Sequence, residues 1–127
     1  MDVYLSRDAF LSIKALGLIS SDSNFDGLLI GHKRGHRFFV KKIFLSVKGF
    51  FPSKEKYLLL NELFDDSIIG FFSFNPDEKK IRKILAPFAF GKVFLDIRLE
   101  RQKRININPF VIEYEEEFYL SPIQLKS

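Results

Sequence analysis

Few side chains in this sequence could do chemistry, and the first to consider are its histidines. The chain has two histidines and no cysteine, which excludes disulfides, thiol nucleophiles and thiolate metal sites. His32 and His36 are four residues apart, a spacing that brings two imidazoles together on a helix. Here they flank a turn around Gly35, and the only nearby carboxylate is Asp26. We therefore expect solvated turn residues rather than a metal pair.

A second group of candidates stands at the end of the apolar stretch from Ile68 to Pro76. The segment 68–74 is apolar on both faces apart from Ser73, which predicts a central strand of a sheet. Asn75 followed by Pro76 is typical of a helix N-cap and first turn. Because Ser73 has no neighbouring base in sequence, this stretch predicts structure more directly than catalysis.

The elements that must position these residues are strands interleaved with helices. The proline at 109 predicts that its strand lies near a sheet edge, and the residues after Leu120 are expected to fray. Nothing indicates a linker or an internal repeat, so residues 1–127 are predicted to form a single α/β domain, a mixed sheet flanked by helices in three-layer fashion. We expect strands at 3–5, 25–31, 37–47, 68–74, 93–97, 105–114 and 118–120, and helices beginning at Ser6, Ser53 and Asn75.

The composition is that of a folded protein and restricts its function only mildly. Hydrophobic residues make up 46% and charged residues 28% of the chain, and its 16 phenylalanines are expected to fill a core. The net charge of +4 permits contact with nucleic acid or acidic proteins without requiring either. No basic segment with an apolar run opens the sequence, and no apolar stretch has the length of a membrane span. We expect a cytoplasmic protein with no membrane association and no cofactor.

Two segments carry a resemblance to a known family. The runs 24–31 (Asn-Phe-Asp-Gly-Leu-Leu-Ile-Gly) and 69–76 (Ile-Gly-Phe-Phe-Ser-Phe-Asn-Pro), with the order of elements, resemble the JAMM/MPN domain of zinc-dependent deubiquitinating and related isopeptidases. The resemblance implies a cytidine deaminase-like architecture over nearly the whole chain. In that family a glutamate precedes the first glycine by three residues, and the second run ends in Gly-Trp-Tyr-His-Ser-His-Pro, followed by Ser-x-x-Asp.

Every functional position of that family is replaced in this chain. The resemblance places the catalytic glutamate on Asn24, the two zinc histidines on Ser73 and Asn75, and the Ser-x-x-Asp pair on Lys83 and Ala86. A hydroxyl and an amide beside a lysine do not supply the three strong ligands that a catalytic zinc needs. We therefore expect no bound metal and no enzyme activity, and interpret the chain as a non-catalytic JAMM/MPN-like interaction or scaffolding module.

An alternative function is binding of RNA or DNA. The first six elements also match the ferredoxin-like β-α-β-β-α-β order of RNA-recognition domains, in which aromatic residues on the third strand stack on bases, and Phe38 and Phe39 occupy that strand. A charged turn offers phosphate contacts, and Lys33, Arg34, Arg37, Lys41 and Lys42 would extend it if the fold brought the two groups together. The candidate residues of this turn are Arg98, Arg101, Lys103 and Arg104.

A possible protein-binding surface comes from Phe50 and Phe51. They lie between Gly49 and Pro52, in a connection rather than a periodic element, so they either cap the core or, if exposed, anchor a partner. The acidic run 115–117 is expected to face solvent. We expect the partner to be another protein or a second copy of this chain.

Overall fold

The computed structural model describes residues 1–19, 25–46 and 53–126. Its elements follow the expected alternation, with three α-helices, two short 3-10 helices and eight strands in this part of the chain. The helices are α1 (Arg7–Ile19), α2 (Lys54–Leu63) and α3 (Glu78–Ile84), with 3-10 turns η1 (Pro87–Ala89) and η2 (Arg101–Lys103). The strands are β1 (Asp2–Leu5), β2 (Asp26–Arg34), β3 (Arg37–Leu45), β4 (Ile68–Phe74), β5 (Val93–Leu99), β6 (Ile105–Glu115), β7 (Glu117–Pro122) and β8 (Gln124–Lys126).

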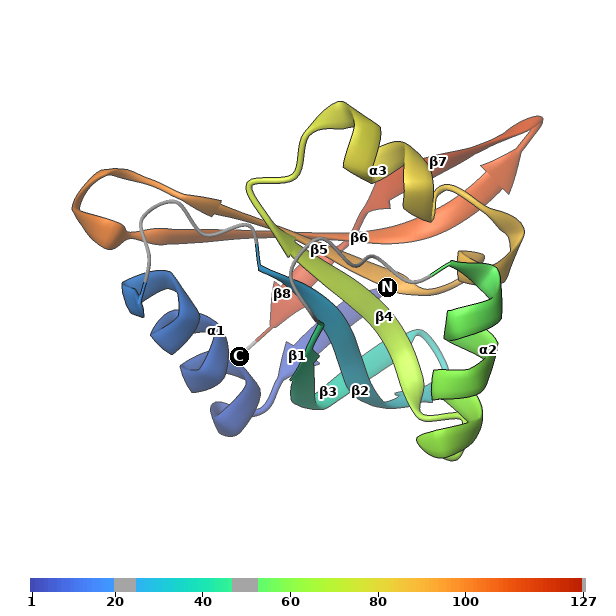
Figure 1. Cartoon of the computed structure of the whole chain (residues 1–127), viewed down its shortest axis with the longest axis horizontal. Helices are drawn as coiled ribbons and strands as arrows, with labels where there is room; N and C mark the ends of the chain where they lie inside the picture. The colour runs from blue at the N-terminus through green and yellow to red at the C-terminus, as the bar shows by residue number, and fades with distance from the viewer. Residues whose placement is uncertain (20–24, 47–52, 127) are drawn as a thin grey trace.

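All eight strands belong to one mixed sheet, ordered β7-β6-β5-β4-β2-β3-β1-β8. β1 runs parallel to β3 and β8, and β4 runs parallel to β5, whereas the remaining neighbours are antiparallel. Because β7 and β8 are consecutive segments at opposite ends of this order, the sheet curls until its two ends meet (Figure 1). The chain is therefore α/β with a nearly closed, barrel-like sheet, which differs from the open three-layer arrangement expected from the sequence.

Two successive residues, Ile123 and Gln124, close the sheet because their N–H groups bond to opposite ends of it. The Ile123 N–H donates to Pro109 O of β6 at 3.1 Å, and the next N–H along the chain, of Gln124, donates to Met1 O at 3.3 Å. The residues after Leu120 thus continue β7 and form β8 against β1, instead of fraying as expected. β8 is three residues long, exposed and polar at both ends, so its sequence carries no strand signal.

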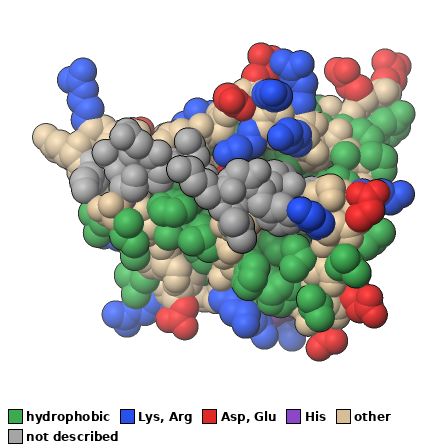
Figure 2. Space-filling model, viewed as in Figure 1, with side chains coloured by type: hydrophobic (Ala, Val, Ile, Leu, Met, Phe, Trp, Pro, Cys, Tyr) green, Lys and Arg blue, Asp and Glu red, His purple; other side chains and the backbone are tan. Residues whose placement is uncertain are grey.

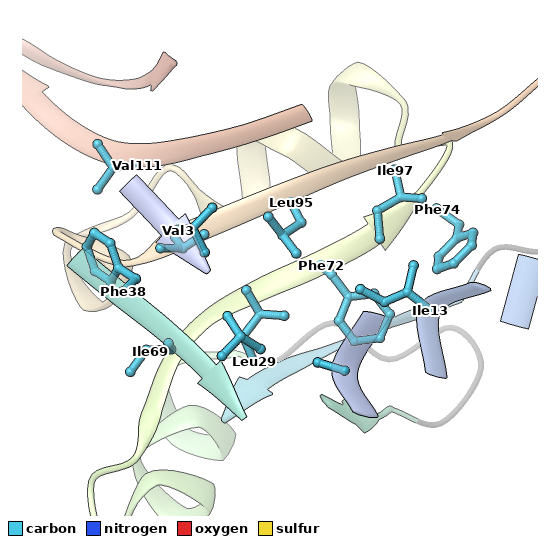
Figure 3. Close-up of a cluster of buried hydrophobic side chains, with 13 residues drawn as sticks. Val3, Ile13, Leu29, Phe38, Ile69, Phe72, Phe74, Leu95, Ile97 and Val111 are labelled. Carbon is cyan, nitrogen blue, oxygen red and sulfur yellow. The ribbon is translucent and has the colours of Figure 1, made fainter. Parts of the chain in front are cut away.

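Most of the core lies inside this curled sheet. Side chains from six strands and α1 point toward one another there, as Figure 3 shows for Phe72, Leu95 and Ile13. α1 contributes Ala9 and Ile13, both fully buried. Phe38 of β3 belongs to the same cluster and is only 2% exposed.

A second core covers the outer face of the sheet beneath α2 and α3. Tyr57 of α2 and Ile84 of α3 pack there against Phe71 and Phe94. At Gly70 of β4 the strands approach so closely that a Cβ would lie 2.2 Å from Val93 O, so only glycine fits.

The two cores place α1 and α2 on opposite faces of the sheet, because α1 packs in the first core and α2 in the second. This is not the ferredoxin-like arrangement considered as the alternative.

Of two local predictions made at prolines, the helix N-cap was wrong and the position of the Pro109 strand was confirmed. The N-cap of α3 is Asp77, whose carboxylate accepts from Lys80 N–H at 2.7 Å, whereas Asn75 has a left-handed φ of 48° and precedes the cap. The strand that contains Pro109, β6, lies next to the terminal strand β7, near an edge of the sheet as predicted. Pro109 is tolerated since its missing N–H would face Ile123, where β7 already passes into β8.

Candidate functional site

A polar row crosses the outer face of the sheet at the place where the family resemblance puts the catalytic residues. In register across β2, β4, β5 and β6 lie, one on each strand, Asp26, Ser73, Asp96 and Asn108. The neighbouring row two residues away on the same strands is apolar, formed by Leu28, Phe71, Phe94 and Phe110. The polar row therefore borders the second core and is the candidate site of this fold.

Two buried residues of the row, Asp26 and Ser73, form a bonded group with the partly exposed Lys80 of α3. The Ser73 hydroxyl donates to Asp26 Oδ1 at 2.6 Å, and Lys80 Nζ of α3 lies 2.9 Å from Asp26 Oδ2. Ser73 is fully buried and Asp26 is 4% exposed. Both oxygens of the Asp26 carboxylate and the Ser73 hydroxyl hydrogen thus have partners, which is the condition for burying such groups at low cost.

This geometry does not favour a nucleophilic serine. A serine nucleophile needs a base that receives its proton and a path for the substrate, and the Ser73 oxygen has no exposed surface. The carboxylate that accepts its proton is already neutralised by Lys80. The arrangement instead ties α3 to the strands beneath it.

The other half of the row is closed by a second ion pair. Arg98 Nε lies 2.8 Å from Asp96 Oδ1, and the Asp96 carbonyl accepts from Asn108 Nδ2 at 3.3 Å. Arg98 is thereby engaged with its own strand rather than free to contact a phosphate. Both carboxylates of the row are thus paired with a cation, Asp26 with Lys80 and Asp96 with Arg98, and neither is free to bind a metal ion.

The residues singled out from the family resemblance are placed as follows. Asn75 Oδ1 accepts the Leu99 N–H at 3.1 Å, so that its amide supports the extension of β5. Lys83 is exposed on α3, and Ala86 is half-buried before η1. Asn24 lies outside the described residues, although the adjacent Phe25 O accepts from Phe74 N–H at 2.9 Å.

The zinc site implied by the resemblance does not fit these residues. The Ser73 oxygen and the Asn75 amide oxygen are engaged in hydrogen bonds, and both are weak ligands compared with imidazole. No cluster of three histidine, aspartate or glutamate side chains able to hold a metal occurs in the described part of the chain. Both histidines are exposed, but only His36 lies in the β2–β3 turn; His32 belongs to β2 and stacks on Phe39 of β3 at 5.0 Å between ring centroids.

Sequence reasoning missed Asp26, Lys80, Asp96 and Asn108 as members of the site. Asp26 and Asp96 had a signal, because each is a carboxylate beside an otherwise apolar strand segment. Lys80 and Asn108 had none, since their positions depend on the placement of α3 and on the pairing of β5 with β6.

The basic residues are divided between two ends of the molecule. Figure 1 places the β2–β3 turn and the β5–β6 turn far apart, so that their cations do not form one surface. Arg101 and Arg104 are exposed in the β5–β6 turn, and the side chain of Lys103 is outside the described set. Of the two aromatic residues considered for base stacking, Phe38 is buried, whereas Phe39 is half-buried and stacks on Tyr4 at 5.1 Å between ring centroids.

An apolar groove lies between β3 and α2 and has a volume of about 330 Å³. Its walls include Phe44, Leu45 and Leu59, which are 44%, 42% and 63% exposed, and Leu63 follows one turn later at 78%. Figure 2 shows hydrophobic surface gathered over this part of the molecule. We call these four residues and the groove between them the β3–α2 face. Phe50 and Phe51 lie outside the described residues.

The fold itself is shared with a protein of known structure. The solution structure of protein DSY2949 from Desulfitobacterium hafniense superposes with a TM-score of 0.66 at 18% sequence identity, covering 98% of this chain and 93% of that chain. No family model and no curated protein matches the sequence. No helix among the described residues is long and apolar enough to cross a membrane. At this identity the comparison establishes a common fold.

Proposed function

We propose that this chain is a non-catalytic JAMM/MPN-like domain that acts as a protein-interaction module, and that a second copy of the chain docks on its β3–α2 face. The observation that carries the proposal is that a polar side chain of the candidate site is buried while apolar side chains of α2 are exposed to water. Ser73, where the resemblance would place a zinc ligand, is fully buried, whereas large apolar side chains on α2 are more than half exposed. Exposed apolar patches of this kind mark protein interfaces.

The shape of the β3–α2 face favours a second copy as the occupant. Leu59 and Leu63, one helical turn apart, form a ridge beside a groove whose walls include Phe44 and Leu45. The same surface therefore offers both a projection and a recess, which is what a two-fold interface requires of each partner. Charges of both signs border it, including Lys42 on β3 and Glu62 on α2, so two copies related by a two-fold axis can pair opposite charges.

Light scattering coupled to size-exclusion chromatography tests this proposal. The wild-type chain is expected to elute with the mass of a dimer, and the double variant Leu59→Lys/Leu63→Lys with the mass of a monomer. The matched control is Leu11→Lys, which places the same charge on a leucine of α1 that is 47% exposed. A wild-type monomer at high micromolar concentration, or a dimer that survives the double variant, contradicts the proposal.

The nucleic-acid alternative has less support. Arg98 is held by Asp96, and the two basic turns lie at opposite ends of the molecule. A protein that follows a phosphate backbone needs several cations on one surface, because its affinity comes from the number of phosphates it neutralises. Absence of binding to single-stranded RNA at low salt would remove this alternative.

A further inference from the structure

At the outer edge of β7 some backbone groups have no partner among the residues that the structure describes, and their identity follows from the closure of the sheet. In an antiparallel pair, the residues that exchange hydrogen bonds alternate with residues whose N–H and C=O point away. Ile123 N–H bonds to β6 and Gln124 N–H to the opposite side, at Met1 O. By this alternation Tyr119 and Ser121 bond to β6, whereas Phe118 and Leu120 direct their N–H and C=O groups outward.

No described strand pairs with this outer edge. β1 pairs with β8 and begins opposite Gln124, so it stops short of β7. An open edge of a sheet is a ready template for another extended chain. The edge is short and ends at Pro122, which offers no N–H, and these features limit pairing to a few residues.

The surroundings of the edge specify the chemistry of an added chain. An open hollow of about 370 Å³ lies over the paired residues Tyr114 of β6 and Phe118 of β7, with Pro87 and Phe90 as its other lining residues, so that Phe118 separates it from the free edge. The adjoining turn carries three consecutive exposed carboxylates, Glu115, Glu116 and Glu117. Figure 2 shows hydrophobic surface beneath acidic side chains in the upper right of the view, where Figure 1 places the end of the β6–β7 hairpin.

We propose that the β7 edge binds an extended peptide segment of a partner protein in which apolar residues alternate with lysine or arginine. The main chain of the segment pairs with Phe118 and Leu120, an apolar side chain packs against Phe118 at the rim of the hollow, and its basic side chains face the glutamates of the turn. Another β7 strand fits less well, because it brings the same glutamates. This site is distinct from the β3–α2 face and does not depend on dimerisation.

A synthetic seven-residue peptide that alternates valine with lysine provides the probe, and its acidic counterpart, which alternates valine with glutamate, is the control. Fluorescence anisotropy is expected to show saturable binding of the first peptide and none of the second. In heteronuclear NMR spectra the amide signals of Phe118 and Leu120 are expected to shift most on binding. In the free protein these two amides should exchange with solvent faster than those of Tyr119 and Ser121.

A pair of variants at one position isolates the backbone contribution. Leu120→Pro removes the outward N–H, whereas Leu120→Ala shortens the same side chain and retains it. We expect Leu120→Pro to weaken peptide binding by about tenfold or more and Leu120→Ala to change it little. Circular dichroism checks that both variants fold. The surface variant Glu115→Lys/Glu117→Lys, which leaves the sheet intact, should also abolish binding, and it provides the test if Leu120→Pro does not fold.

The inference fails in three ways that can be told apart. Undetectable binding at millimolar peptide, equal binding of the acidic peptide, or binding that persists in both Leu120→Pro and Glu115→Lys/Glu117→Lys each overturns it. The variant Leu59→Lys/Leu63→Lys should bind the peptide as wild type does, which separates this site from the proposed dimer face.

Discussion

The polar row beneath α3 and the β3–α2 face differ in which side chains they bury: the row buries polar groups, and the face exposes apolar ones. In the row, a serine and a carboxylate are withdrawn from solvent and bonded to each other and to Lys80. On the β3–α2 face, Leu59 and Leu63 are 63% and 78% exposed. Polar groups that are buried and fully paired are explained by folding alone, whereas clustered apolar groups left in water are not.

The difference identifies which surface is available for function. Chemistry at the row would require opening the contact between α3 and the sheet, which costs the Asp26–Lys80 pair and the Ser73 hydrogen bond. Docking at the β3–α2 face would remove apolar surface from water without breaking the contacts of the row. Mutations should therefore affect stability at the row and association at the face.

The largest effect on stability is expected for Asp26→Ala. The substitution leaves Lys80 without its counter-ion and Ser73 without its acceptor. Because Lys80 is 25% exposed and can recover some hydration, we expect a loss of about 3 kcal/mol in the free energy of unfolding, at the lower end for a broken buried pair. Urea denaturation measures it.

The control for this variant is Glu78→Ala in the same helix. Glu78 and Arg82 form an exposed pair at 3.5 Å, so its loss should change stability by about 0.5 kcal/mol or less. If the two variants are equally stable, the row does not hold α3 on the sheet.

Ser73→Ala should have an intermediate effect. It removes one hydrogen bond to a charged acceptor but preserves the Asp26–Lys80 pair, so we expect a loss of about 1.5 kcal/mol. In a double-mutant cycle with Asp26→Ala, the two losses should be far from additive, because both variants remove the same bond. Additive losses would show that the Ser73 hydroxyl and Asp26 act independently.

The smallest effect on stability is expected for Leu63→Lys. At 78% exposure its side chain contributes little to the core, so the free energy of unfolding of the monomer should change by about 0.5 kcal/mol or less. The same variant should weaken dimerisation, measured by sedimentation equilibrium. A large loss of monomer stability would mean that Leu63 belongs to the core and that the comparison between row and face is wrong.

Much of the local structure could be predicted from the sequence because its signals are local. Strand 68–74 is found at the expected residues, and α2 begins after Ser53, whose side chain accepts from Lys56 N–H. The β2–β3 turn has Gly35 at a φ of 56°, as a tight hairpin requires. These features depend on apolar patterning, capping side chains and glycine, each contained within a few residues.

The closure of the sheet and most of the polar row depend on contacts between distant residues. The β1–β8 pairing joins the two ends of the chain, and no feature of residues 124–126 indicates it. Ser73 and Asn75 were identified in advance, but the partner of Ser73 is Asp26 rather than a residue at position 24. Strand register decides which side chains meet, and the linear sequence does not display it.

The central claim, that the row is a structural contact and not a metal centre, is tested most directly by titrating zinc into the purified chain by isothermal calorimetry. The row predicts no stoichiometric site, because Ser73 and Asn75 are weak ligands already engaged in hydrogen bonds and Asp26 is paired with Lys80. Zinc bound at one equivalent per chain in the wild type, and lost in both Ser73→Ala and Asn75→Ala, would contradict the account.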